Sequence, residues 1–106
     1  MATLKPSVQN SIAAPVANRV DLAEHVNRTG AEFLKLDLEL GLTFSGIALQ
    51  AQDSERRART RQLSRKAYDT VLRLMHRVKL TDEDAQSLAR NLIRLKCDLV
   101  MLGEIL

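Results

Sequence analysis

Residues 34–44 read LKLDLELGLTF, and the conformation of this stretch decides the fold. Apolar side chains alternate with polar residues or glycine, which is the period-two pattern of a half-buried strand. Leucine, however, is a strong helix former, and Thr43 is the only β-branched residue in the run. No second strand is evident in the sequence, and a lone strand would leave its backbone groups unpaired. We therefore predict a helix over residues 31–51.

As a helix, this segment has apolar side chains on two sides. One stripe holds Leu34, Leu38, Leu42 and Leu49, and the other holds Leu36, Leu40, Phe44 and Ile47. A helix with two apolar stripes is expected to lie between two neighbours. Gly41 and Gly46 within it permit either a close approach of another helix or a kink.

The patterns on either side of this segment extend the prediction to an all-α fold. We expect a short N-terminal helix over residues 16–28, opened by Pro15 and ended by Gly30. Two further main helices are expected over residues 53–79 and 81–103. The prediction is a small antiparallel helical bundle of three main helices plus the short N-terminal helix. It forms a single domain over residues 15–106, preceded by a flexible arm over residues 1–14.

The last helix has the clearest local signals. Thr81 is a good N-cap, and the acidic residues that follow it favour the positive end of the helix dipole. Apolar residues then recur in steps of three and four, as in a heptad pattern. This seam consists of Ala85, Leu88, Leu92, Leu95, Leu99, Leu102 and Leu106. The short connection before Thr81 indicates that the last two helices are antiparallel neighbours.

Composition limits the classes of function. The chain has 106 residues, of which 3% are aromatic, and we do not expect a chain this short to enclose a large catalytic cavity. Its single cysteine, Cys97, cannot form an intrachain disulfide, and we expect a packed thiol there. We expect a cytoplasmic protein without a membrane span. His25, His76 and Cys97 are not spaced as metal ligands. We expect no metal, no cofactor and no enzymatic activity.

Positive charge is concentrated in one segment. The net charge is +3, but residues 53–79 hold 9 basic and 3 acidic side chains. Six of the basic residues fall within residues 56–66, and they are Arg56, Arg57, Arg59, Arg61, Arg65 and Lys66. Such a helix could bind nucleic acid or another polyanion. The alternative is a solvated helix whose arginines pair with Glu39, Asp53, Glu55 or Glu104.

A third candidate feature is centred on His76. Arg73 stands three residues before this histidine and Lys79 three residues after it. The segment resembles the motif of histidine phosphotransfer domains, which are helical bundles with an exposed phosphate-accepting histidine and a lysine that stabilises the phosphoryl group. The resemblance implies phosphate transfer through His76, although Met75 and Leu80 stand where the family has small residues. The alternative is a surface histidine near a helix C-terminus.

The predicted bundle has more apolar surface than one copy of the chain can bury. The surplus residues are Leu36, Leu40, Phe44, Ile47, Val100, Met101 and Ile105. Exposed apolar stripes of this length are usually interfaces. We therefore expect a non-enzymatic assembly or adaptor module that forms a homodimer, with the basic helix available to an acidic protein or nucleic acid. The alternative is that the short N-terminal helix covers this surface.

Overall fold

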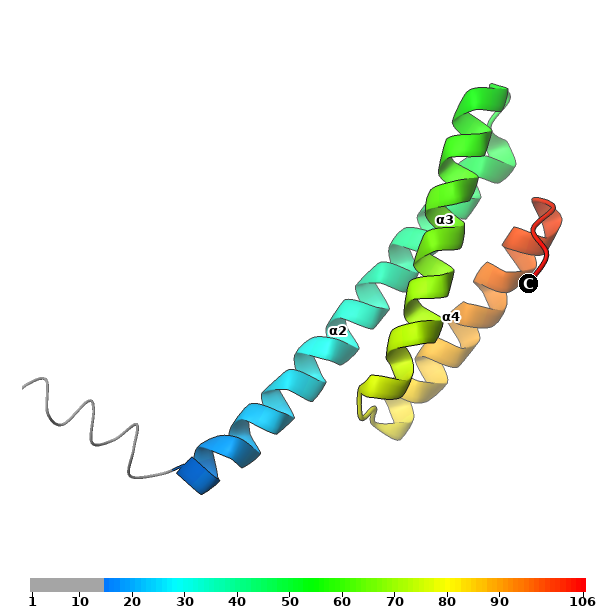
Figure 1. Cartoon of the computed structure of the whole chain (residues 1–106). Coiled ribbons are helices and arrows are strands. Elements are labelled where there is room, and N and C mark those ends of the chain that lie inside the picture. The colour runs from blue at the N-terminus through cyan, green and yellow to red at the C-terminus, as the bar shows by residue number, and fades with distance from the viewer. Residues whose placement is uncertain (1–14) are drawn as a thin grey trace, which may run out of the picture.

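The computed structural model describes the backbone of residues 15–106 and the side chains of residues 22–106 (Figure 1). Its elements are α2 (Pro15–Gln50), α3 (Ser54–Leu74), the short 3₁₀ helix η1 (Met75–Arg77) and α4 (Asp82–Met101). The described part of the chain is helical and contains no strand, so the all-α prediction and the helix at residues 34–44 are confirmed. The arm expected over residues 1–14 lies outside the described residues.

The prediction of a separate short helix over residues 16–28 is wrong, because α2 continues through Gly30 without a break. Gly30 has a packing role instead of ending a helix. A Cβ atom at this position would lie 2.8 Å from Cγ2 of Val78, so the glycine lets the segment after η1 approach α2 closely. Beside this contact, the side-chain oxygen of Asn27 accepts a hydrogen bond from the Lys79 N–H at 3.1 Å.

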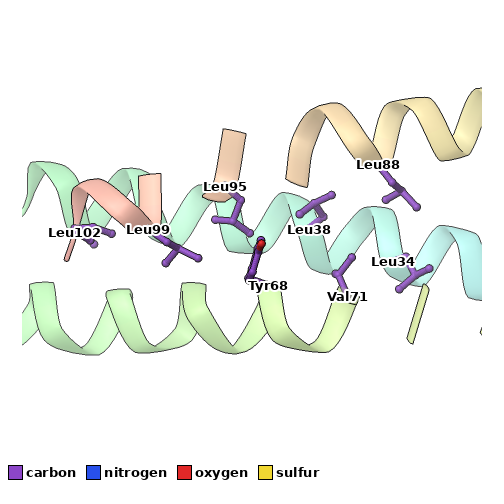
Figure 2. Packing of buried hydrophobic residues seen from close by; sticks show 9 residues of the cluster. Leu34, Leu38, Tyr68, Val71, Leu88, Leu95, Leu99 and Leu102 are labelled. Carbon is purple, nitrogen blue, oxygen red and sulfur yellow. The ribbon is translucent and has the colours of Figure 1, made fainter. Parts of the chain in front are cut away.

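Helix α2 is the element on which the other two helices pack, and the core lies along one side of it (Figure 2). The buried cluster consists of Leu34, Leu38 and Ala48 from α2, Tyr68 and Val71 from α3, and Leu88, Leu95, Leu99 and Leu102 from α4 and its end. Most of the predicted heptad seam is therefore in the core, whereas Ala85 and Leu106 at its ends are exposed.

The molecule is long and thin, measuring 66 × 31 × 17 Å. Its radius of gyration is 20.0 Å, against about 13 Å for a compact domain of this length. The first turns of α2 extend past the turn that joins α3 to α4 (Figure 1). Helices α3 and α4 are antiparallel, as predicted, but each contacts α2 more than it contacts the other. One layer of core side chains therefore holds the three helices together.

Two small residues allow α3 and α4 to lie close to α2. A Cβ atom on Gly41 would lie 2.9 Å from Cδ2 of Leu95 and 3.1 Å from Cβ of Ala67, so close approach, one of the two expected roles of this glycine, is confirmed. Ser64 of α3 is fully buried and donates its hydroxyl hydrogen to the carbonyl oxygen of Gly41 at 2.9 Å.

The helix ends follow local capping rules. The Asp53 carboxylate accepts hydrogen bonds from the N–H groups of Glu55 and Arg56, and the Thr81 hydroxyl accepts one from the Asp84 N–H at 3.1 Å. Helix α3 ends at Leu74, five residues before the predicted end, because the chain turns through η1 into the contact with α2.

Helix α4 ends in a Schellman motif, in which a glycine with positive φ follows the C-cap. Gly103 has φ +94° and donates to the Val100 carbonyl at 3.0 Å, and the Glu104 N–H donates to the Leu99 carbonyl at 2.9 Å. This turn directs Glu104 back toward α3.

Candidate interaction surfaces

The second apolar stripe predicted on residues 31–51 lies on the outside of the molecule. Leu36 is 60% exposed and Leu40 is 47% exposed, while Phe44 and Ile47 are half-buried. Phe33, on the same side, is 49% exposed. Because α3 and α4 are already packed in this structure, neither of them covers the stripe.

The exposed stripe extends further toward the N-terminus than the sequence analysis expected. Val26, Phe33, Leu40 and Ile47 recur every seven residues, and Leu22, Thr29, Leu36 and Thr43 form a second series with the same period. These eight residues occupy the a and d positions of one heptad register, and we call them the outer seam. Leu22 and Val26 are both exposed. The sequence prediction omitted Leu22 and Val26 from the interface because it placed them in a separate helix that ended before Gly30. Phe33 lies within the predicted helix 31–51, and its seven-residue spacing from Leu40 was visible.

One edge of the outer seam is formed by α3. A shallow groove of about 200 Å³ lies there, lined by Phe33, Asp37, Leu40 and Phe44 of α2 and by Leu63, Lys66, Ala67 and Thr70 of α3. Leu63 and Lys66 are exposed, so this edge adds apolar area and positive charge. Partial burial raises the pKa of Asp37 above its ordinary value, since desolvation disfavours the charged form.

The opposite edge of the outer seam is acidic. Glu32 and Glu39 are both exposed and stand seven residues apart on α2. On α3, Arg59, Lys66 and Arg73 are exposed with the same spacing. The apolar outer seam therefore lies between a negative edge on α2 and a positive edge on α3.

The other three predicted interface residues, Val100, Met101 and Ile105, are exposed but lie at the C-terminal end of α4 and beyond it. Helix α4 contacts α2 through the Lys35–Asp84 ion pair and through the Ser45 hydroxyl, which donates to the Asp98 carboxylate at 2.7 Å.

The position of α4 separates the predicted interface residues into two groups. Leu40 is five residues from both Lys35 and Ser45, which places it about 140° around α2 from each of these contacts. The seven predicted interface residues thus form two patches on different sides of α2, and only the patch on α2 is continuous over several helical turns.

The basic helix is partly neutralised within the chain. The Arg61 guanidinium donates to the Glu104 carboxylate, and Arg65 Nη1 donates to Glu104 Oε1 at 2.9 Å. Arg65 also pairs with Asp69 at 3.1 Å. The pKa of Glu104 is lowered, mainly by the hydrogen bond from Arg61 and also by that from Arg65. Glu104 was one of the expected pairing partners.

The four remaining basic candidates in this run are Arg56, Arg57, Arg59 and Lys66. All four are exposed, and none forms a salt bridge within residues 22–106. They remain available to an acidic partner, whereas Arg61 and Arg65 do not.

The geometry around His76 differs from that of a helical phosphotransfer site. His76 is exposed, as the resemblance implies, but it lies on η1 after the end of α3. Lys79 lies beyond this turn, so the two residues are not one turn apart on a common helix. Cys97 is exposed, which corrects the expectation of a packed thiol.

No protein family, curated protein or solved structure that was compared with the chain matches it. In the described part of the chain, no helix has the length and hydropathy needed to cross a bilayer. Over the same residues, no cluster of histidine, cysteine and carboxylate side chains is arranged to hold a metal ion.

Proposed function

We propose that the protein is a non-enzymatic helical assembly module that self-associates through the outer seam of α2. The observation that carries this proposal is that Phe33, Leu36 and Leu40 stay about half exposed or more after α3 and α4 have packed. Apolar area left in contact with water favours association, by about 25 cal/mol for each Å² that a partner buries.

The alternative in which residues 16–28 fold back over this surface loses its support. These residues continue α2 in a straight line and add Leu22 and Val26 to the exposed apolar residues. The N-terminal part of α2 therefore enlarges the surface that needs a partner.

The test is the mass of the chain in solution. Sedimentation equilibrium of the wild-type chain at micromolar concentration should give a dimer. The double substitution Leu36→Glu/Leu40→Glu should give a folded monomer by circular dichroism and sedimentation, because it places charges on the outer seam. Val100→Glu, on the α4 patch, is the matched control and should remain dimeric. A wild-type monomer, or dissociation caused by Val100→Glu alone, would contradict the proposal.

We infer polyanion binding as a second candidate function, favoured by the exposure of Arg56, Arg57 and Arg59 without an ion pair in the described part of the chain. Contacts of this kind release counterions, so affinity must fall steeply with salt. Fluorescence anisotropy with a labelled duplex should show this dependence, and Arg56→Gln/Arg57→Gln should reduce the slope. Binding that does not change with salt would exclude this function.

A further inference from the structure

We propose that two copies of the chain pack their α2 helices parallel and in register, so that Glu39 of one copy lies beside the partner's Lys66. This inference rests on the proposed self-association and adds the direction, the register and the contacting edges of the dimer. The occupant of the outer seam is thus a second copy of the same chain.

The register follows from the spacing of the outer seam. Val26, Phe33, Leu40 and Ile47 occupy a positions, while Leu22 and Leu36 share the d positions with Thr29 and Thr43. Residues 22–47 span between three and four heptads, or about 37 Å of helix. In a parallel, in-register pair, each a or d side chain meets the same residue of the other helix. The large apolar residues then meet one another along the whole length.

The direction follows from the charges on the two edges. Glu32 and Glu39 lie on the side of α2 away from α3. On α3, Lys66 lines the groove at the seam, and Arg59 and Arg73 stand seven residues before and after it, on the same face of the helix. A two-fold axis parallel to α2 brings the acidic edge of each copy against the basic edge of the other. A two-fold axis perpendicular to α2 brings like edges together instead.

The parallel arrangement is thus the one with complementary charges, and like charges brought together would oppose the antiparallel one. Asp37 is the one acidic residue among those lining the groove at the basic edge. Lys66 lines the same groove and offsets this charge, and Arg59 and Arg73 stand one heptad away on the same face of α3.

Lys66 and Glu39 also lie at similar positions along the axis of α2. Lys66 lines the groove together with Phe33, Asp37 and Leu40 of its own chain. Its position along α2 is therefore close to that of Glu39. In an in-register parallel pair, Glu39 faces the partner chain at this same level, within reach of the partner's Lys66.

Disulfide formation tests the direction. In a Cys97→Ser background, cysteine is placed at the d positions as Thr29→Cys or Thr43→Cys. Each single variant should form covalent dimers under mild oxidation, because d residues of a parallel pair meet their equivalents. Arg90→Cys, exposed on α4, is the control and should not cross-link efficiently.

The outcomes of this experiment distinguish a failure of self-association from a failure of the parallel arrangement. A Cys97→Ser chain that sediments as a monomer overturns self-association itself. A dimer in which Thr43→Cys chains cross-link with Val26→Cys chains, and neither variant cross-links with itself, has antiparallel helices, because a positions face d positions in an antiparallel pair. This result overturns the parallel arrangement and leaves self-association standing. A dimer that cross-links only through Arg90→Cys associates through the exposed face of α4 around Arg90, which overturns the outer seam as its interface.

Charge reversal tests the contacting edges. Glu39→Lys and Lys66→Glu should each raise the dissociation constant of the dimer about fivefold, as expected when the two symmetry-related exposed charge pairs become repulsive. The double variant Glu39→Lys/Lys66→Glu should return to within about twofold of the wild type, since the pair is restored with opposite polarity. Lys96→Glu on α4 should have no effect. A double variant weaker than both single variants would contradict the proposed contact.

Discussion

The Ser64 hydroxyl donates a hydrogen bond to the Gly41 carbonyl oxygen at 2.9 Å, across the contact between α3 and α2. The absence of a side chain on Gly41 allows this bond, because it brings the two helix backbones close together. Leu95 of α4 approaches the same glycine. All three helices therefore meet at Gly41, and the bundle should be more sensitive to substitution there than at Gly46, where a Cβ atom would meet nothing within 4 Å.

Gly41 and Gly46 should respond in opposite directions to alanine. A Cβ atom on Gly41 would lie 2.9 Å from the buried Leu95 side chain, whereas one on Gly46 would meet nothing within 4 Å. Overpacking costs about 1–3 kcal/mol and exceeds the helix-propensity gain of about 1 kcal/mol. Urea denaturation should show that Gly41→Ala lowers the free energy of unfolding and that Gly46→Ala raises it. A stabilised Gly41→Ala chain would contradict the observed helix approach.

The Ser45–Asp98 hydrogen bond should contribute to the attachment of α4. Ser45 is fully buried and donates to the Asp98 carboxylate at 2.7 Å. Ser45→Ala should lower the free energy of unfolding by about 1–3 kcal/mol, because it leaves a partly buried carboxylate without this donor. A double-mutant cycle with Asp98→Ala measures the coupling. Additive effects of the two substitutions would show that the bond contributes no stability.

Glu104 should make stability depend on pH in the acid range. Its pKa in the folded chain is lowered from the ordinary value of 4.5, first by the hydrogen bond from Arg61. The stabilisation is therefore complete above the unfolded pKa and is lost as the pH falls through the folded pKa. Glu104→Gln should lose about 1 kcal/mol of unfolding free energy at pH 7 and almost none at pH 2. An equal loss at both pH values would rule out a charge-dependent contribution.

Asp37 should give stability a pH dependence of the opposite sign to that from Glu104. Burial raises its pKa above the ordinary value of 3.8, so its contribution to stability is complete below the unfolded pKa and is lost as the pH rises through the folded pKa. Asp37→Asn should therefore stabilise the chain at pH 7 and have little effect at pH 2, as measured by thermal unfolding. Destabilisation at pH 7 would show that the ionised carboxylate makes a favourable contact.

The sequence predicted the helices that rest on local signals. Leucine content favoured helix over strand at residues 34–44, and the capping by Asp53 and Thr81 follows from the side chains at those positions. The prediction that Gly30 ends a helix rests on the local weakening of helices by glycine, and it is wrong. Its actual role depends on Val78, a residue 48 positions away that no local pattern connects to it.

The interaction surfaces were only partly predictable, because they also depend on contacts between residues that are distant in the sequence. The exposed stripe with Leu36 and Leu40 was visible as a periodic pattern. The placement of Val100 and Met101 on another side of the molecule depends on which face of α2 is occupied by α4. That face is set by tertiary contacts such as Ser45–Asp98, which periodicity alone does not specify.

The Schellman turn at Gly103 makes the basic character of α3 depend on the last residues of the sequence. Loss of the Glu104 side chain would remove the carboxylate that pairs with Arg61 and Arg65. Arg61 would then lose its carboxylate partner, whereas Arg65 would keep Asp69, on a helix that already presents several exposed cations. The Glu104 side chain therefore sets how much positive charge α3 offers in the proposed polyanion-binding experiment, and the mass of the sample should be verified before any such titration.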